Sequence, residues 1–305
     1  MKIKINPLML TACIGMLFFL MGTFPVEGAK NTKPRLYIKG LAGMQNAKTG
    51  DFDDFYTQNS LFYSEFEKAN TGYTISFTRP RKDFRGLGGE IGLETDRFAV
   101  GISADFIEKE YNLLLDYNDA TTGYSEKRTW NYSLKAVPIF VMFHYKLINS
   151  GILTISLSVG EGVYLIRYRD IRNQTFENAD LTFSNGIVTS KKYQLGFHGG
   201  TSIELKVMPN FSLCIDAAYR FVKLENMNAT SYFEDDLGII TKKNQLYYSV
   251  NPDTGEARFS SSKYGLPWDS RLAKMRLDGL TLSAGIKIIF GSVKKSNPTK
   301  ADSGE

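Results

Sequence analysis

Residues 191–224 read KKYQLGFHGGTSIELKVMPNFSLCIDAAYRFVKL and carry the clearest two-residue periodicity in the chain. In each half, apolar side chains alternate with polar ones, and Pro209 with Asn210 between the halves is typical of a tight turn. The stretch therefore predicts one β-hairpin. Both arms exceed the roughly 5–6 residues of an average soluble strand and reach the ~9–11 residues that a tilted membrane-spanning strand needs. This length favours a membrane protein.

The N-terminal residues predict an export signal. Two lysines precede an apolar run over residues 7–21, and small residues follow that run. Because the run is shorter than the ~20 residues of a spanning helix, we expect a cleaved signal peptide over residues 1–28 rather than a retained anchor. A lipoprotein signal at Cys13 is a second alternative, but the apolar run continues beyond this cysteine, where a lipobox would end it.

The composition is typical of an exported all-β protein. Tyr and Phe are abundant, with 17 and 21 residues, and no apolar run after the signal is long enough for a spanning helix. Without the signal, Cys214 is the single cysteine, so an internal disulfide is excluded. The formal net charge of +5 is spread along the chain without a basic cluster, so we expect no nucleic-acid partner.

Strand periodicity recurs after the signal and predicts eight strands in all. They are residues 35–44, 86–94, 98–107, 133–147, 152–169, the two arms of the hairpin, and 275–290. Short links alternate with long ones, as they do in outer-membrane barrels with short periplasmic turns and long external loops. Compact soluble domains rarely have four long links on one side. The sequence therefore predicts an all-β fold, an eight-stranded antiparallel up-and-down transmembrane β-barrel over residues 29–290, with both ends periplasmic.

The last predicted strand adds a targeting pattern. Ser283, Gly285, Ile288 and Phe290 resemble the C-terminal strand that the barrel-assembly machinery reads in outer-membrane proteins. Residues 291–305 follow this strand, and their polar composition predicts a disordered periplasmic tail. With the signal and the strand count, these features make the chain resemble the small eight-stranded outer-membrane barrels of the OmpW, OmpX and OmpA-barrel type. The resemblance implies the outer membrane of a Gram-negative-type bacterium, contact with outer-membrane lipid and, for OmpW, a hydrophobic channel.

Polar residues on the predicted interior face form the main candidate site. They are Lys39, Glu90, Glu94, Asp105, His198, Glu204, Asp216, Arg220 and Lys287. An eight-stranded barrel is just wide enough for its own side chains, and an unpaired buried ion is costly. We therefore expect a structural network of paired charges. The functional alternative is a narrow polar path in which Arg220 and Glu204 form a gate.

Two segments predict irregular strands. Residues 133–147 are apolar on both faces, which suits a strand between lipid and an apolar lumen, but Pro138 cannot donate a ladder hydrogen bond. The break expected at Pro138 is either a β-bulge or a lateral opening for an apolar solute. Residues 159–163, VGEGV, predict a second bulge, because a shift of the apolar phase there would keep Glu161 out of the lipid.

The sequence gives little support for catalysis. His144 and His198 are the only histidines, and neither has a nucleophile or carboxylate at an informative spacing. No residue cluster predicts a metal ion or cofactor. The glycine-rich residues 86–92 fall within a strand that no helix follows, so they do not predict a nucleotide-binding loop. We therefore do not expect an enzyme.

The long loops complete the list of candidate sites. Residues 51–66 are acidic and aromatic, and residues 246–261 predict an external hairpin, so either segment could bind a surface ligand. Our first functional hypothesis is a narrow channel or binding barrel for a small solute, which could be hydrophobic. The alternative is a non-conducting structural or adhesive barrel whose loops bind a partner.

Overall fold

The computed structural model describes residues 33–70, 72–77, 84–119, 121–176, 181–189, 192–235, 238–263 and 267–291. The predicted signal peptide, including Cys13, and residues 292–305 of the predicted tail lie outside the described residues. The chain divides into two units, Met1–Pro34 and Arg35–Glu305, and every strand and helix discussed below belongs to the second unit.

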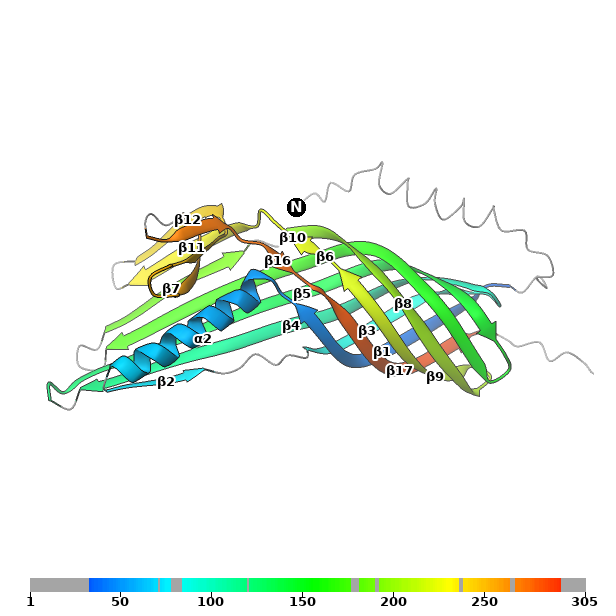
Figure 1. Ribbon diagram of the computed structural model, residues 1–305. Coiled ribbons are helices and arrows are strands. Elements are labelled where there is room, and N and C mark those ends of the chain that lie inside the picture. The colour runs from blue at the N-terminus through cyan, green and yellow to red at the C-terminus, as the bar shows by residue number, and fades with distance from the viewer. Residues whose placement is uncertain are drawn as a thin grey trace, which may run out of the picture. The chain divides into compact units, whose positions relative to one another are not determined.

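Eight antiparallel strands close into a barrel (Figure 1). In order around the wall they are β1 (Arg35–Lys48), β3 (Phe84–Glu94), β4 (Phe98–Asp119), β5 (Tyr124–Asn149), β6 (Leu153–Phe176), β8 (Lys192–Met208), β9 (Phe211–Phe221) and β17 (Asp278–Phe290). Pairing of β1 with β17 and of β6 with β8 completes the ring. Closure satisfies the backbone of every edge, as hydrocarbon requires. The predicted eight-stranded barrel is confirmed.

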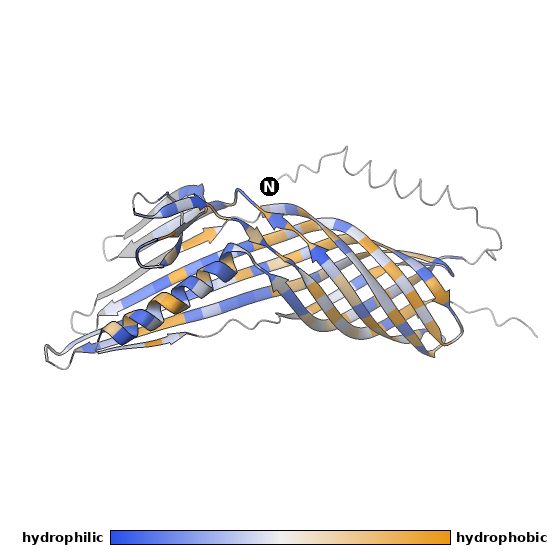
Figure 2. Ribbon diagram, in the orientation of Figure 1, coloured by the Kyte–Doolittle hydropathy of each residue, from blue (hydrophilic) through white to orange (hydrophobic). Residues whose placement is uncertain are grey.

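Apolar and polar residues alternate along the strands of the barrel (Figure 2). The large apolar side chains are exposed on the outside of the barrel, and the charged ones are buried inside it. On β8 and β9, Phe197, Ile203, Ile215 and Tyr219 are 47–56% exposed. The intervening Ser202, Glu204, Ser212 and Cys214 are buried. The two faces predicted for the hairpin are thus the two faces of the wall. An apolar belt of this extent needs a hydrocarbon environment.

Three barrel strands continue well beyond the barrel on the side opposite the short turns (Figure 1). β4, β5 and β6 are 22, 26 and 24 residues long, about twice the length that crosses a membrane. β2 (Tyr73–Phe77) pairs with β4, and β7 (Leu181–Thr189), β11 (Asn228–Asp235) and β12 (Gly238–Gln245) continue the sheet from β6. The long external links are therefore largely strands. We call everything outside the closed barrel on this side the extracellular extension.

The segment predicted as an acidic aromatic loop is instead the helix α2 (Asp51–Ala69). Gly50 precedes it with a φ of 62°, which favours glycine, and acidic side chains in the first turn suit the helix dipole. Phe52, Phe55 and Tyr63 are buried along one side. Their spacing of three and eight residues is helical, and it is the signal that the loop interpretation overlooks. Among the described residues, no helix is long and apolar enough to cross a membrane.

Two small sheets complete the extension. The predicted hairpin at residues 246–261 is present as β13 (Tyr247–Val250) and β14 (Ala257–Ser260), but it pairs with β15 (Asp269–Leu272) rather than lengthening the barrel wall. β10 (Lys223–Leu224) pairs with β16 (Met275–Arg276).

Neither predicted bulge is present. β6 keeps a constant register with β5 and β8 across residues 159–163, so the apolar phase does not shift. Glu161 consequently lies on the outward face, opposite Val141 and Phe197, and the prediction that it avoids the lipid-facing wall is wrong. The glycine before it lies in a tight place, because a Cβ at Gly160 would be 3.0 Å from the carbonyl oxygen of Val141 and would displace the Met142 side chain.

Pro138 interrupts a ladder without shifting it. Pairing of β4 with β5 stops at Ala104 with Ile139 and resumes at Ile107 with Ala136 in the same register. On its other side Pro138 pairs with Tyr164 of β6. The missing N–H of proline therefore opens a gap of two residue pairs between β4 and β5, and the expected bulge is replaced by this gap.

Candidate functional site

Glu94 is the centre of an ion-pair network in the half of the lumen nearest the short turns. Arg35 Nη2 and Lys146 Nζ donate to its carboxylate at 3.0 and 3.1 Å. Lys287 Nζ lies 2.8 Å from Glu94 and 2.9 Å from Glu204. Apart from Arg35, these side chains are buried. Three cations thus share two carboxylates, so no buried ion in this group lacks an opposite charge.

Glu90 organises the next layer of the lumen. Its carboxylate accepts a hydrogen bond from the Tyr37 hydroxyl and lies 2.7 Å from His144 Nε2. Nearby, Lys39 Nζ pairs with Asp216 at 2.6 Å and donates to Ser202 at 3.1 Å. These contacts join strands that are up to three places apart around the barrel. They stiffen the barrel and leave the middle of the lumen filled.

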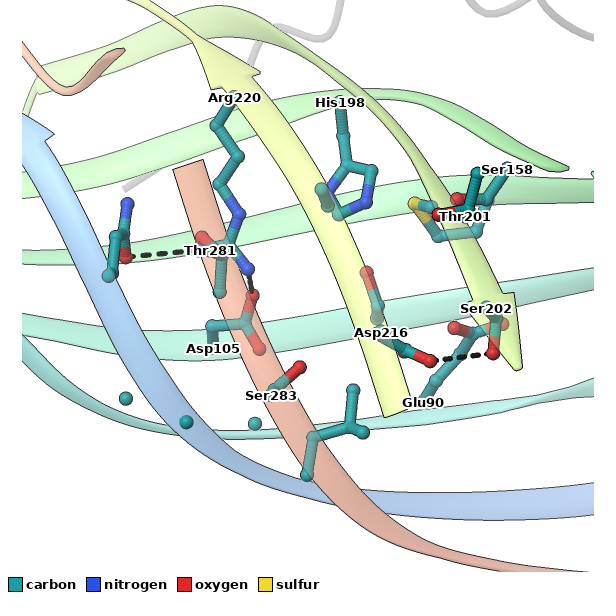
Figure 3. Close-up of a pocket in the computed structure, with 18 of the residues that line it drawn as sticks. Glu90, Asp105, Ser158, His198, Thr201, Ser202, Asp216, Arg220, Thr281 and Ser283 are labelled. Atoms are coloured by element: carbon teal, nitrogen blue, oxygen red, sulfur yellow. Dashed lines mark hydrogen bonds and ion pairs between the residues drawn. The ribbon is translucent and has the colours of Figure 1, made fainter. Parts of the chain in front are cut away.

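A cavity of about 50 Å³ lies above this layer (Figure 3). On one side of it Arg220 pairs with Asp105 and lies 3.3 Å from the Gln45 amide oxygen. Among the described residues, nothing pairs with the buried Nδ1 of His198 or Nε of Arg220. A cavity of this volume accommodates roughly three water molecules. It is therefore suited to solvating these two groups.

Aromatic side chains fill the lumen on the side of the cavity that is nearer the extension. Phe140 and Tyr164 meet edge to face with ring centroids 5.5 Å apart. Further out, Phe55 of α2 packs on Tyr132 at 4.8 Å and on Phe259 at 5.1 Å. These rings belong to one continuous buried apolar cluster that runs from the barrel into the extension. We call this cluster the aromatic plug.

All nine predicted interior residues lie on the inner side of the wall. Lys39 pairs with Asp216, Arg220 with Asp105, Lys287 with Glu94 and Glu204, and Glu90 with His144. His198 stands apart, with its ring 5.5 Å from Phe140. Arg220 and Glu204, the predicted gate, have separate partners in different layers. The structure therefore does not bring the two gate residues together.

Sequence reasoning missed Tyr37, His144 and Lys146 as members of the network. Residues 133–147 were interpreted as apolar on both faces, but the last part of their inner face is polar. That face continues in steps of two from Met142 to His144 and Lys146, both of which are buried. Following the same alternation to the end of the strand would have found both residues.

The targeting pattern is divided between the two faces of β17. Ser283 and Gly285 face the lumen, whereas Ile288 and Phe290 are exposed on the outer wall. A Cβ at Gly285 would collide with the carbonyl oxygen of Gly40 on β1. The glycine thus has a packing role in barrel closure, and the targeting role of the pattern stays a prediction.

A larger cavity, of about 280 Å³, lies in the extension. It opens between the sheet of β6, β7 and β11 and the small sheet that contains β14. Its polar lining consists mainly of Arg172, Arg258, Ser231, Ser260, Ser261 and Ser262. We call it the extension pocket. Among the described residues, no group of three or more His, Cys, Asp or Glu side chains is placed to hold a metal ion.

Several solved outer-membrane proteins are similar to this chain in structure. A major outer membrane protein from Thermus thermophilus matches with 13% identity and a TM-score of 0.41, over 85% of this chain and 100% of its own. The outer membrane protein AlkL in DMPC bilayers matches with 12% identity and a TM-score of 0.32, over 90% and 98%. Ail, the attachment invasion locus protein of Yersinia pestis, matches with 10% identity and a TM-score of 0.29, over 84% and 97%.

No protein-family model and no curated protein sequence matches the chain. Its class therefore follows from its own architecture. Eight sequential antiparallel strands close on themselves, large apolar side chains cover the outer wall, and charged side chains pair inside. Only a closed barrel with an apolar exterior satisfies the backbone of strands in lipid. The chain is a small eight-stranded outer-membrane β-barrel protein.

Proposed function

We propose that this protein is a non-conducting outer-membrane barrel that presents its extracellular extension as a binding surface. The observation that carries the proposal is the filled lumen. A solute would have to pass the network around Glu94, the layer of Glu90 and then the aromatic plug. Separating the buried ion pairs would leave uncompensated charges, each costing several kcal/mol. The side chains that fill the lumen are thus better explained as a structural core than as the lining of a solute path.

The extension is built as a rigid platform. α2 is fixed at its start by Asp51, which pairs with Arg271 at 2.6 Å and accepts a hydrogen bond from the backbone N–H of Lys274 at 2.6 Å. Along its length, Phe52 and Phe55 are buried in the aromatic plug. Rigid elements position binding groups more accurately than free loops do. The extension therefore has the properties of a preformed surface for a partner outside the cell.

Planar-bilayer recording tests the non-conducting barrel. The mature protein, refolded and checked by its mobility shift on heating, should give no discrete current steps over a range of salts and voltages. A matched sample of a known porin would verify that the bilayer reports channels. Reproducible current steps from the folded protein would contradict the proposal.

Cell-surface display tests the binding surface. Cells that display the intact barrel should bind an array of extracellular glycans and matrix proteins more strongly than cells displaying a variant in which residues 247–260 are replaced by a short glycine-serine link. This replacement removes the β13–β14 hairpin and leaves the barrel strands intact. Equal binding by both cell types, at equal display levels, would count against the extension as the binding element.

Lateral passage of a small hydrophobic solute is the second candidate, and the gap at Pro138 favours it. Phe106, which lies within the gap, is one of the residues that line the interior cavity and is 41% exposed on the outer wall. The gap therefore lies at a position of the wall where one residue borders the interior cavity and is also exposed outside. Pro138→Val should restore the missing ladder hydrogen bonds and reduce uptake of a hydrophobic solute by whole cells. Unchanged uptake in the folded variant would dismiss this route.

A further inference from the structure

Arg172 is held at the extension pocket in a fixed orientation. Its Nε and Nη2 donate to Asp170 at 3.1 and 2.8 Å, and its guanidinium lies 5.5 Å from the centre of the Trp130 ring. Burial lowers the pKa of Arg172, but the paired carboxylate outweighs this and leaves the pKa well above its ordinary range. Neither hydrogen bond to Asp170 uses the remaining nitrogen of the guanidinium, Nη1.

Burying the carboxylate of Asp170 costs free energy, and the gain in stability from its ion pair with Arg172 does not explain why the charge is there. Its side chain is 0% exposed and belongs to the inner face beside Tyr132 and Tyr168. An ion pair buried in apolar surroundings is often no more stable than apolar residues of the same volume. Asp170 does, however, fix the orientation of Arg172. We take this as an indication that the arginine is positioned for a ligand.

Arg258 approaches the pocket from the other sheet and is also braced by a carboxylate, through one of its oxygens. Its Nε and Nη2 both lie 2.7 Å from Glu256 Oε1, and its guanidinium lies 5.2 Å from the centre of the Trp268 ring. The two arginines thus come from separate sheets, β6 and β14, and both line one cavity. Each bracing carboxylate balances the charge of its arginine, so the pocket recognises a ligand by the direction of its donors rather than by bulk charge.

The hydrogen-bonding character of the lining defines the chemistry of the ligand. Among the described residues, the lining contains two guanidinium groups, four serines and Tyr232, and it contains no Asp, Glu, Asn or Gln. Guanidinium groups donate and never accept, so the pocket is rich in donors and poor in strong acceptors. Its natural complement is a group rich in acceptors, which is an oxyanion such as a carboxylate, sulfate or phosphate.

The volume of the pocket indicates that the oxyanion is attached to a larger group. A cavity of about 280 Å³ falls just below the ~300–1,000 Å³ of sites for drug-sized ligands. Ile187 and Phe259 are buried in the lining beneath the polar rim. One sugar ring, with hydroxyls for the serines and a C–H face for the apolar residues, suits both the size and the lining.

We propose that the extension pocket binds a single anionic sugar unit, a monosaccharide residue that carries a carboxylate or a sulfate ester, at the end of an extracellular glycan. The braced guanidinium groups of Arg172 and Arg258 bind the oxyanion. Ser260 and Ser261 donate their hydroxyl protons to Ser262 and Ser231, so their oxygens accept hydrogen bonds from the ring hydroxyls. This inference rests on the proposed role of the extension as a binding surface, and it names the ligand class and the residues.

Calorimetric titration of the full mature chain in detergent micelles tests the inference with four probes. D-Glucuronate represents the carboxylated sugar, glucosamine 6-sulfate the sulfated sugar, D-glucose the neutral ring and inorganic sulfate the bare oxyanion. We expect one or both anionic sugars to bind at least about tenfold more tightly than glucose, since charge-assisted hydrogen bonds exceed neutral ones by this order. Which of the two binds identifies the source. Equal binding of glucose, or no binding of either anionic sugar, overturns the inference.

Matched variants assign the binding to the pocket. Arg258→Gln, at a side chain that is 36% exposed, should weaken binding of the anionic sugar by about tenfold or more. Arg128→Gln is the control, because Arg128 is 37% exposed, is braced by Glu126 two residues away and lies outside the lining. It should change affinity by less than about twofold. An equal loss in both variants, with both folded by heat modifiability, overturns the inference.

Failure of this inference can be told apart from failure of the proposed function. If the barrel does not conduct and binds glycans or matrix proteins through the extension, the proposed function holds. If it then shows no preference for anionic sugars, this inference alone is wrong. A barrel that conducts but binds D-glucuronate through Arg258 gives the reverse result.

Discussion

Lys287 Nζ lies 2.8 Å from Glu94 Oε2 and links β17 to β3 across the lumen side of the strand between them, β1. The same nitrogen reaches Glu204 on β8 at 2.9 Å. One buried cation from the last strand therefore binds carboxylates from both flanks of the closing seam.

Removing this cation should destabilise the barrel strongly. Lys287→Met leaves Glu94 and Glu204 to share the remaining cations, and breaking a buried ion pair at one partner costs about 3–5 kcal/mol. Urea titration of the protein refolded in lipid vesicles measures the free energy of unfolding. Lys223→Met is the control, since Lys223 is largely exposed in its pair with Glu225 and should change stability by less than about 1 kcal/mol. Similar losses in the two variants would contradict the role of Lys287.

The helix α2 should depend on one aromatic side chain. Phe55 is buried in the aromatic plug, and truncation of a buried Phe costs about 3–5 kcal/mol. Phe55→Ala should therefore expose α2 to hydrogen exchange and protease while the barrel keeps its heat-modifiable mobility. Leu61→Ala, on the same helix but 59% exposed, should leave both readouts unchanged. If the Phe55 variant stays as protected as the Leu61 variant, the helix is held by other contacts.

A variant at Gly285 can distinguish a packing role of this glycine from a targeting role. A side chain at this position would meet the backbone of Gly40, so Gly285→Ala should impair closure of β17 on β1. We expect a lower yield of heat-modifiable barrel when the variant refolds in detergent without any assembly machinery. Gly40→Ala is the neighbouring control, because a Cβ there meets nothing within 4 Å. If the Gly285 variant refolds at the wild-type yield, the glycine is not needed for barrel closure, and targeting is its remaining predicted role.

Replacing Arg172 alone should destabilise the extension, and replacing Asp170 as well should restore most of the lost stability. Arg172→Met leaves Asp170 buried without its bidentate partner, which should destabilise the extension by about 3–5 kcal/mol. Combining it with Asp170→Leu removes the stranded charge and should restore most of this stability, but not sugar binding. Protease susceptibility of the extension reports the stability. A double variant as unstable as the single one would show that the ion pair itself stabilises the fold.

Local alternation was enough to predict the wall of the barrel. Side chains on β-strands alternate strictly, so Phe197 and Ile203 had to share one face and Ser202 and Glu204 the other, whatever the rest of the chain did. The same rule placed Lys287 and Glu94 inside. It could not say that these two meet, because their strands are 193 residues apart in the chain and come together only when β1 closes the ring.

The irregular parts of the chain were harder to predict, for a physical reason. Pro138 guaranteed a missing hydrogen bond, but the neighbouring strands decide whether that loss produces a bulge or a gap. Phe52 and Phe55 showed helical spacing, yet the helix is stable because Tyr111 and Tyr132 of distant strands cover them. The extension pocket was invisible to sequence, since Arg172 and Arg258 belong to separate sheets.

By itself, then, the sequence determined which side chains face lipid and which face inward, because that property depends only on the two-residue repeat of each strand. Tertiary structure alone decided which buried charges pair, that aromatic side chains from α2 and the long strands form one buried cluster, and that two braced arginines share a pocket. Those features depend on contacts between segments that the closure of the barrel and the folding of its extension bring together.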